Sequence, residues 1–159
     1  MTVAIQILAA LAVLTNAVVY GTDVLAALVM RSVYARLDDA TMTRSAGWGH
    51  HYADLRMPPV GVTGLLSALG AAVLAGIAGL AVPAVAAATA VVALVAWLAL
   101  YARIAKPINS AQKAAAKSGV IPENARALQD RWDSIIYARV GLQMVALTAL
   151  VVVLATAGL

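Results

Sequence analysis

The segment MPPVGVTGLLSALGAAVLAGIAGLAVPAVAAATAVVALVAWLALYA, residues 57–102, carries no charged side chain between Arg56 and Arg103. Its apolar character is interrupted only at the Ala-Val-Pro step around Pro83. A helix needs about 20 apolar residues to cross the roughly 30 Å hydrocarbon layer of a bilayer. Residues 60–80 and 84–104 therefore predict two membrane-spanning helices joined by a tight turn.

The two ends of the chain predict two further spans. Residues 3–30 are mostly apolar, with Asp23 as their one charge, and the uncharged C-terminal tail predicts a span over about 135–158. The chain shows no alternating strand pattern that would close a barrel. We therefore expect an all-α polytopic membrane protein, with residues 1–159 forming a single four-transmembrane-helix bundle.

Composition and charge agree with this class and exclude others. Hydrophobic residues make up 64% of the chain, and the mean hydropathy is +0.92. The net charge is +4, and all basic residues lie in Arg31–Arg56 and Arg103–Arg139. This distribution is typical of membrane topology and does not indicate a nucleic-acid partner. The positive-inside rule then predicts two cytoplasmic basic loops and both termini outside.

The cysteine and glycine content bears on the chemistry and on the helix packing that we expect. Cysteine is absent, which excludes disulfides, thiolate metal sites and thiol redox catalysis. Gly70, Gly76 and Gly79 allow close helix packing. Their partner is either the third span of the same chain or a second protomer, so a homo-oligomer remains an option.

Polar side chains form one stripe on the first span and one on the last. Asn16, Tyr20 and Asp23 are spaced i, i+4, i+7, and Trp132, Arg139 and Gln143 are spaced i, i+7, i+11. Asp23 and Arg139 each lie about 20 residues from the outer end of their helix. Because a charge facing lipid costs at least ~2.5–3.5 kcal/mol, we predict that these two residues form an ion pair or share a polar cavity. The pair would serve either structure or binding.

The first basic loop contains both histidines, in the segment Gly47–Pro59. In a helix, His50 and Asp54 share a face, which lets a carboxylate orient an imidazole. Three interpretations remain open. The first is general acid/base catalysis by His50 or His51. The second is a copper or iron site with His50, His51 and Asp54 as ligands. The third is an interfacial anchor formed by Trp48, Tyr52 and Arg56.

The second basic loop contains Lys-Pro-Ile-Asn, residues 106–109, followed by Arg131 and Trp132 at the start of the last helix. The Asn109 amide and the Trp132 indole are able to cap a helix, to pack in the core, or to bind a planar substrate.

Four short motifs together resemble the anthrone-oxygenase-like family of small four-span membrane proteins. They are His-His-Tyr-Ala-Asp-Leu-Arg-Met-Pro at 50–58, Lys-Pro-Ile-Asn at 106–109, Arg-Trp-Asp at 131–133 and Tyr-Ala-Arg at 137–139. The similarity covers essentially the whole chain. Fungal members are implicated in oxidising an anthrone to an anthraquinone in aromatic polyketide biosynthesis. The chain departs from the family pattern Asn-x-Pro-Ile-Asn at Ala105, which occupies the first Asn position.

The resemblance implies a membrane-embedded monooxygenase that uses molecular oxygen on a hydrophobic aromatic substrate. The cofactor stays open: a mechanism through these residues needs none, and copper or iron is the alternative. The expected catalytic residues are His50, Asp54, Arg56 and Arg139, with His50 as a base oriented by Asp54 and an arginine stabilising the oxyanion. The expected substrate-binding residues are Tyr20, Asp23, Trp48, Tyr52, Asn109, Arg131 and Trp132. The alternatives are a His-ligated metal-dependent oxidase and a non-enzymatic subunit that binds a lipid, quinone or isoprenoid.

Overall fold

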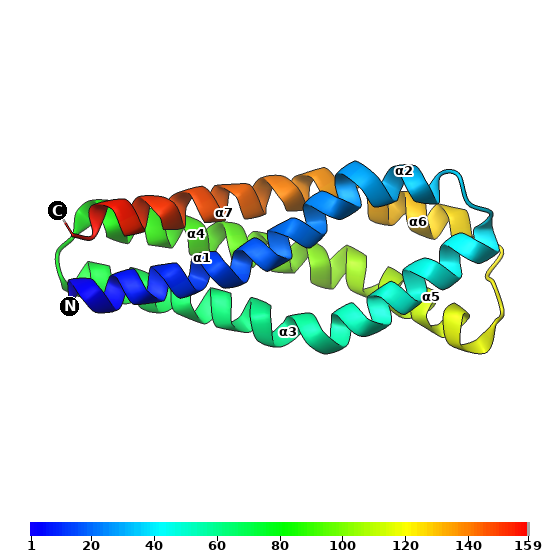
Figure 1. The fold of residues 1–159 in the computed structure, drawn as a ribbon, viewed down its shortest axis with the longest axis horizontal. Helices are drawn as coiled ribbons and strands as arrows, with labels where there is room; N and C mark the ends of the chain where they lie inside the picture. Colours follow the sequence, from blue (N-terminus) through cyan, green and yellow to red (C-terminus); the bar gives the residue numbers. More distant parts are fainter. Residues whose placement is uncertain (159) are drawn as a thin grey trace.

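The computed structural model describes residues 1–158, which contain helices and no strand (Figure 1). In chain order the elements are α1 (Thr2–Leu25), the π-helical turn η1 (Ala26–Met30), α2 (Arg31–Tyr34), α3 (Asp39–Ile77), α4 (Ala81–Leu100), the π-helical turn η2 (Tyr101–Ala105), α5 (Lys106–Ser118), α6 (Ala125–Asp133) and α7 (Ile136–Thr156). These elements join end to end into four long rods, over Thr2–Tyr34, Asp39–Ile77, Ala81–Ser118 and Ala125–Thr156.

Each rod is long and apolar enough to cross a membrane, so the predicted number of apolar helices is confirmed. The rods are longer than the predicted spans. The shortest has 32 residues, or about 48 Å of helix, against roughly 30 Å of hydrocarbon. The extra length lies in the segments that the sequence marked as basic loops.

The first expected loop is largely helical. Only Ala35–Asp38 separates α2 from α3, and α3 then runs without a break through Pro58 and Pro59. The Asp38 carboxylate caps this helix by accepting hydrogen bonds from the Thr41 amide (2.9 Å) and hydroxyl (2.6 Å). These bonds hold the pKa of Asp38 below its usual range. The helical start of α3 is thus fixed well before the apolar stretch begins.

Prolines are accommodated inside the rods in two ways. Pro58 and Pro59 remove two helical hydrogen bonds within α3, and Figure 1 shows α3 changing direction near its middle. Pro107 is the second residue of α5, with Lys106 between it and η2, and the wider π-helical turn takes up the space that the proline ring needs. Neither proline site ends its helix.

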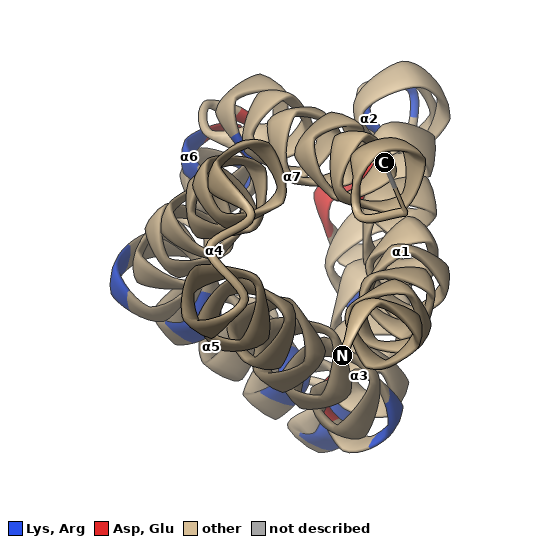
Figure 2. Cartoon of the chain, turned by 90° about the vertical axis from the view of Figure 1, so that its left-hand side faces the viewer, with Lys and Arg blue, Asp and Glu red and all other residues tan. Residues whose placement is uncertain are grey.

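The four rods stand around a common axis, in the order α1, α3, α4, α7 (Figure 2). The N-terminus, the end of α7 at Thr156 and the tight turn at Gly79 (φ +70°) lie at one end, called the termini end. The connections Ala35–Asp38 and Gly119–Asn124 lie at the opposite end, called the basic end.

The half of the bundle nearest the termini end has a solid core of small residues. Each rod contributes a fully buried alanine to one cluster, namely Ala12, Ala68, Ala90 and Ala146. Small side chains let helix backbones approach closely, which is how helices associate without large side chains. Toward the basic end the rods also bury larger and polar side chains, including Ile108, Gln112 and Trp132.

Candidate functional site

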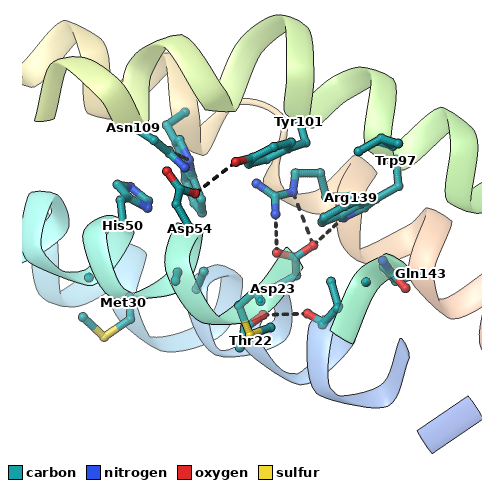
Figure 3. Close-up of a pocket in the computed structure, with 18 of the residues that line it drawn as sticks. Thr22, Asp23, Met30, His50, Asp54, Trp97, Tyr101, Asn109, Arg139 and Gln143 are labelled. Atoms are coloured by element: carbon teal, nitrogen blue, oxygen red, sulfur yellow. Dashed lines mark hydrogen bonds and ion pairs between the residues drawn. The ribbon is translucent and has the colours of Figure 1, made fainter. Parts of the chain in front are cut away.

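A cavity of about 390 Å³ lies between the four rods, on the basic-end side of the alanine core, and is called the central cavity. All four rods line it, mostly with apolar side chains. Its polar and aromatic lining includes Asp23, His50, Asp54, Trp97, Tyr101 and Arg139 (Figure 3). Met57 and Pro58 also line it, so α3 bends at the wall of the cavity.

The predicted Asp23–Arg139 ion pair is present and buried. Arg139 Nη2 lies 2.7 Å from Asp23 Oδ1, and Arg139 Nε lies 3.3 Å from Asp23 Oδ2. Trp97 Nε1 also donates to Asp23 Oδ2, at 2.7 Å. The carboxylate is therefore held by three donors from α4 and α7, which compensates its removal from water.

The Arg139 guanidinium also contacts two indole rings. Its carbon lies 5.0 Å from the centre of the Trp97 ring and 5.3 Å from that of Trp132. Nε and Nη2 bind Asp23, and Nη1 makes no hydrogen bond within residues 1–158. In Figure 3 this nitrogen points away from Asp23, toward the side on which Asp54 lies. Arg139 thus presents fixed N–H donors to a ligand oxygen.

A second carboxylate, that of Asp54, also has two bonded partners. Tyr101 Oη donates to Asp54 Oδ1 at 3.0 Å, and the Lys113 ammonium pairs with Asp54 Oδ2. The predicted partner of Asp54, His50, is not hydrogen-bonded to it in the described residues. The Tyr101 ring stacks on Trp97, with ring centres 5.9 Å apart and an interplanar angle of 3°. Because Trp97 binds Asp23 and Tyr101 binds Asp54, this aromatic pair connects the two carboxylates.

His50 lies at the cavity wall against Trp132. The two ring centres are 5.7 Å apart, and Trp132 Nε1 donates to Asn109 Oδ1 at 3.1 Å. The indole of Trp132 therefore touches both the candidate base and the Arg139 guanidinium. His50, Asn109 and Trp132 all line the central cavity, as the substrate-binding interpretation requires.

The two adjacent histidines point in different directions. His51 packs edge-on against Trp48 (5.5 Å) and Tyr52 (5.1 Å) and does not line the central cavity. Within residues 1–158 no three His, Cys, Asp or Glu side chains converge on a point that would hold a metal ion. The ligand set expected from His50, His51 and Asp54 is thus not assembled.

Several predicted site residues lie away from the central cavity. Trp48 and Tyr52 are 43% and 49% exposed, and Arg56 lies over the Tyr52 ring at 5.0 Å. Tyr20 and Arg131 do not line the cavity either. The helical path of α3 explains the first three, since it turns them outward and turns His50 and Asp54 inward. Their exposure on the outer surface agrees with the anchor interpretation.

The residues in or beside the cavity that sequence reasoning missed include Met30, Trp97, Tyr101 and Lys113. The i, i+4 spacing of Trp97 and Tyr101 in an otherwise aliphatic span was the available signal. Met30 and Tyr101 lie in the π-helical turns η1 and η2, and both turns contribute to the cavity wall. Such turns are frequent at functional sites.

Comparisons of the chain with protein-family models, with curated proteins and with solved structures gave no match.

Proposed function

We propose that this chain is an integral membrane enzyme that oxygenates a hydrophobic, planar aromatic substrate of the anthrone type. The observation that carries the proposal is the convergence of His50, Arg139 and Trp132 on one largely apolar cavity. Its volume of about 390 Å³ lies within the range of roughly 300–1,000 Å³ typical of small-molecule sites. The Trp97, Tyr101 and Trp132 rings offer stacking surfaces for a flat ligand.

The proposed reaction divides between His50 and Arg139. The His50 imidazole removes one proton from the CH₂ group of the anthrone, and the Arg139 N–H donors stabilise the charge that develops on the carbonyl oxygen opposite. The resulting carbanion is oxidised by molecular oxygen, and a C–O bond forms to give a hydroperoxide. Loss of water then leaves the second carbonyl of the anthraquinone. One O₂ is consumed and one H₂O is released, with the electrons supplied by the substrate.

Asp54 has a different place in this scheme from the one expected from sequence. Tyr101 and Lys113 occupy its two oxygens, so the proposed base acts without a carboxylate bonded to it. Asp54 instead fixes the Tyr101 ring, which supports the stacked face of Trp97 beside Arg139.

The proposal includes insertion in a bilayer with the basic end in the cytoplasm and both termini outside. All Lys and Arg residues lie in Arg31–Arg56 and Arg103–Arg139, toward the basic end of the bundle. The positive-inside rule assigns that end to the cytoplasmic side. Asp23 lies 21 residues after Thr2, or about 32 Å along the helix, close to the thickness of the hydrocarbon layer. The central cavity would then lie at the inner boundary of the bilayer, within reach of a lipid-soluble substrate.

The test is oxygen uptake by purified protein in lipid nanodiscs with dithranol, a simple anthrone. We expect His50→Gln to lower the rate by about 100-fold or more, which is the contribution of a positioned base. His51→Gln is the matched control and should stay within about twofold of wild type, because that ring packs against Trp48 and Tyr52 outside the cavity. Equal rates in the two variants would remove the base role of His50.

Two further outcomes identify the alternatives. Metal near one equivalent that is lost in the His50→Gln variant would indicate a metal-dependent oxidase. Absence of oxygen uptake by the wild-type protein, together with a co-purified lipid, quinone or isoprenoid, would indicate a binding subunit.

A further inference from the structure

Gln143 on α7 is a buried polar residue that the proposed reaction does not use. Its side chain is 1% exposed and lines the central cavity, and its Oε1 atom has no hydrogen-bond partner within residues 1–158. Most buried polar atoms in folded proteins have a partner, so an unpaired amide oxygen at a cavity wall needs an explanation. Two other buried oxygens without partners, on Thr43 and Gln112, do not line this cavity.

The surroundings of Gln143 form a separate polar end of the cavity. Asn16 on α1 also lines the cavity, is 2% exposed, and donates from Nδ2 to the Ala12 carbonyl at 2.9 Å. Gly64 on α3 makes room for this amide, since a Cβ there would lie 2.7 Å from Asn16 Nδ2. Three rods therefore shape this end of the cavity around two carboxamides.

This polar end lies beyond the ion pair as seen from His50. Gln143 follows Arg139 by one helical turn, or about 6 Å, toward the termini end. Figure 3 shows Gln143 and His50 on opposite sides of the Asp23–Arg139 pair. In the proposed pose the CH₂ group lies at His50 and the carbonyl at Arg139, so the two outer rings lie on either side of that axis. A ligand held in this way would reach Gln143 only with a group on the carbonyl-side edge of an outer ring.

We propose that Gln143 binds a hydroxyl group on an outer ring of the substrate, at the edge that flanks the carbonyl held by Arg139. This inference rests on the proposed function and adds a specificity-determining residue to its cavity. A carboxamide oxygen recognises a neutral O–H or N–H donor, and rotation about the last side-chain bond of glutamine turns that oxygen toward the cavity. The charges of Asp23 and Arg139 compensate each other, so this end of the cavity carries no net charge. It therefore suits a neutral ligand group better than a charged one.

The experiment measures binding of two stable product-type ligands, anthraquinone and 2-hydroxyanthraquinone, by quenching of tryptophan fluorescence in nanodiscs. All proteins carry Trp48→Phe, because Trp48 lies outside the cavity whereas Trp97 and Trp132 line it. We expect the parent protein to bind the hydroxylated ligand about tenfold more tightly, the effect of one buried hydrogen bond. Gln143→Met should reduce that preference to within about twofold and leave anthraquinone affinity unchanged.

The comparison of two ligands in one variant separates recognition from folding. Gln143→Leu removes the same amide with a shorter side chain, and it should also reduce the preference for the hydroxylated ligand to within about twofold. A tenfold preference that persists in both variants would overturn the inference. So would loss of binding of both ligands in both variants, because Gln143 would then have a general structural role. A Gln143-dependent preference without any oxygen uptake would support this inference and reject only the oxygenase.

Discussion

The buried pair of Asp23 and Arg139 allows the sharpest test of how the bundle is held together. In Arg139→Met the carboxylate of Asp23 keeps a single donor, Trp97 Nε1, and in Asp23→Asn the guanidinium loses its counter-ion. Removing one partner of a buried ion pair costs about 3–5 kcal/mol, because the other charge stays buried and unpaired. We expect each single variant to be destabilised by about that much.

The double variant Asp23→Asn, Arg139→Met should recover most of this loss, since it contains no unpaired charge. The expected coupling energy is therefore about 2–4 kcal/mol. An ordinary interhelical hydrogen bond in a membrane protein gives about 0.6 kcal/mol on average and about 1.7 kcal/mol at most. A coupling above that limit distinguishes a buried charge pair from a polar contact.

The assay is SDS-induced unfolding in mixed micelles, followed by far-UV circular dichroism, on all four proteins of the cycle. Arg31 and Asp133 provide the matched control pair. They lie 3.9 Å apart with the Arg31 side chain 47% exposed, and their coupling should be below about 1 kcal/mol. Additive effects of Asp23→Asn and Arg139→Met would refute the reasoning, as would equal couplings for the two pairs.

Two other predictions concern packing and topology. Gly64→Ala should destabilise the bundle by about 1–3 kcal/mol in the same assay, because its Cβ would press on Asn16, whereas Gly76→Ala, with open space around its Cβ, should be neutral within about 1 kcal/mol. The absence of cysteine makes single-cysteine labelling straightforward. A membrane-impermeant maleimide added to intact cells should label Ala78→Cys at the termini end but not Ser118→Cys at the basic end, and the reverse pattern would contradict the proposed orientation.

The sequence predicted those features that depend on the energetics of burial alone. Four apolar segments are visible in composition, because a membrane span needs about 20 residues of low polarity wherever it lies in the chain. The Asp23–Arg139 pair was predictable for a related reason. A charge within an apolar helix needs a compensating partner, and the two residues lie at similar distances from the helix ends. Neither inference required knowledge of how the helices are connected.

The extent of the helices was not predictable from the same signals. Proline inside a helix usually ends or bends it, so Pro58, Pro59 and Pro107 suggested boundaries. The rods continue through all three positions because α3 bends at its two prolines and because η2 widens the turn before Pro107. Packing against neighbouring rods thus overrides a local preference that the sequence shows plainly.

The misplaced end of the third helix also explains the misassigned partner of Asp54. An i, i+4 spacing brought His50 and Asp54 to one face of α3, but a shared face permits contact without requiring it. Because the rod continues past Pro107 into α5, Lys113 reaches Asp54 together with Tyr101 and takes the position expected for the imidazole. His50 is left facing the cavity and Trp132, so its proposed basicity depends on the cavity and its ligand and not on a bonded carboxylate.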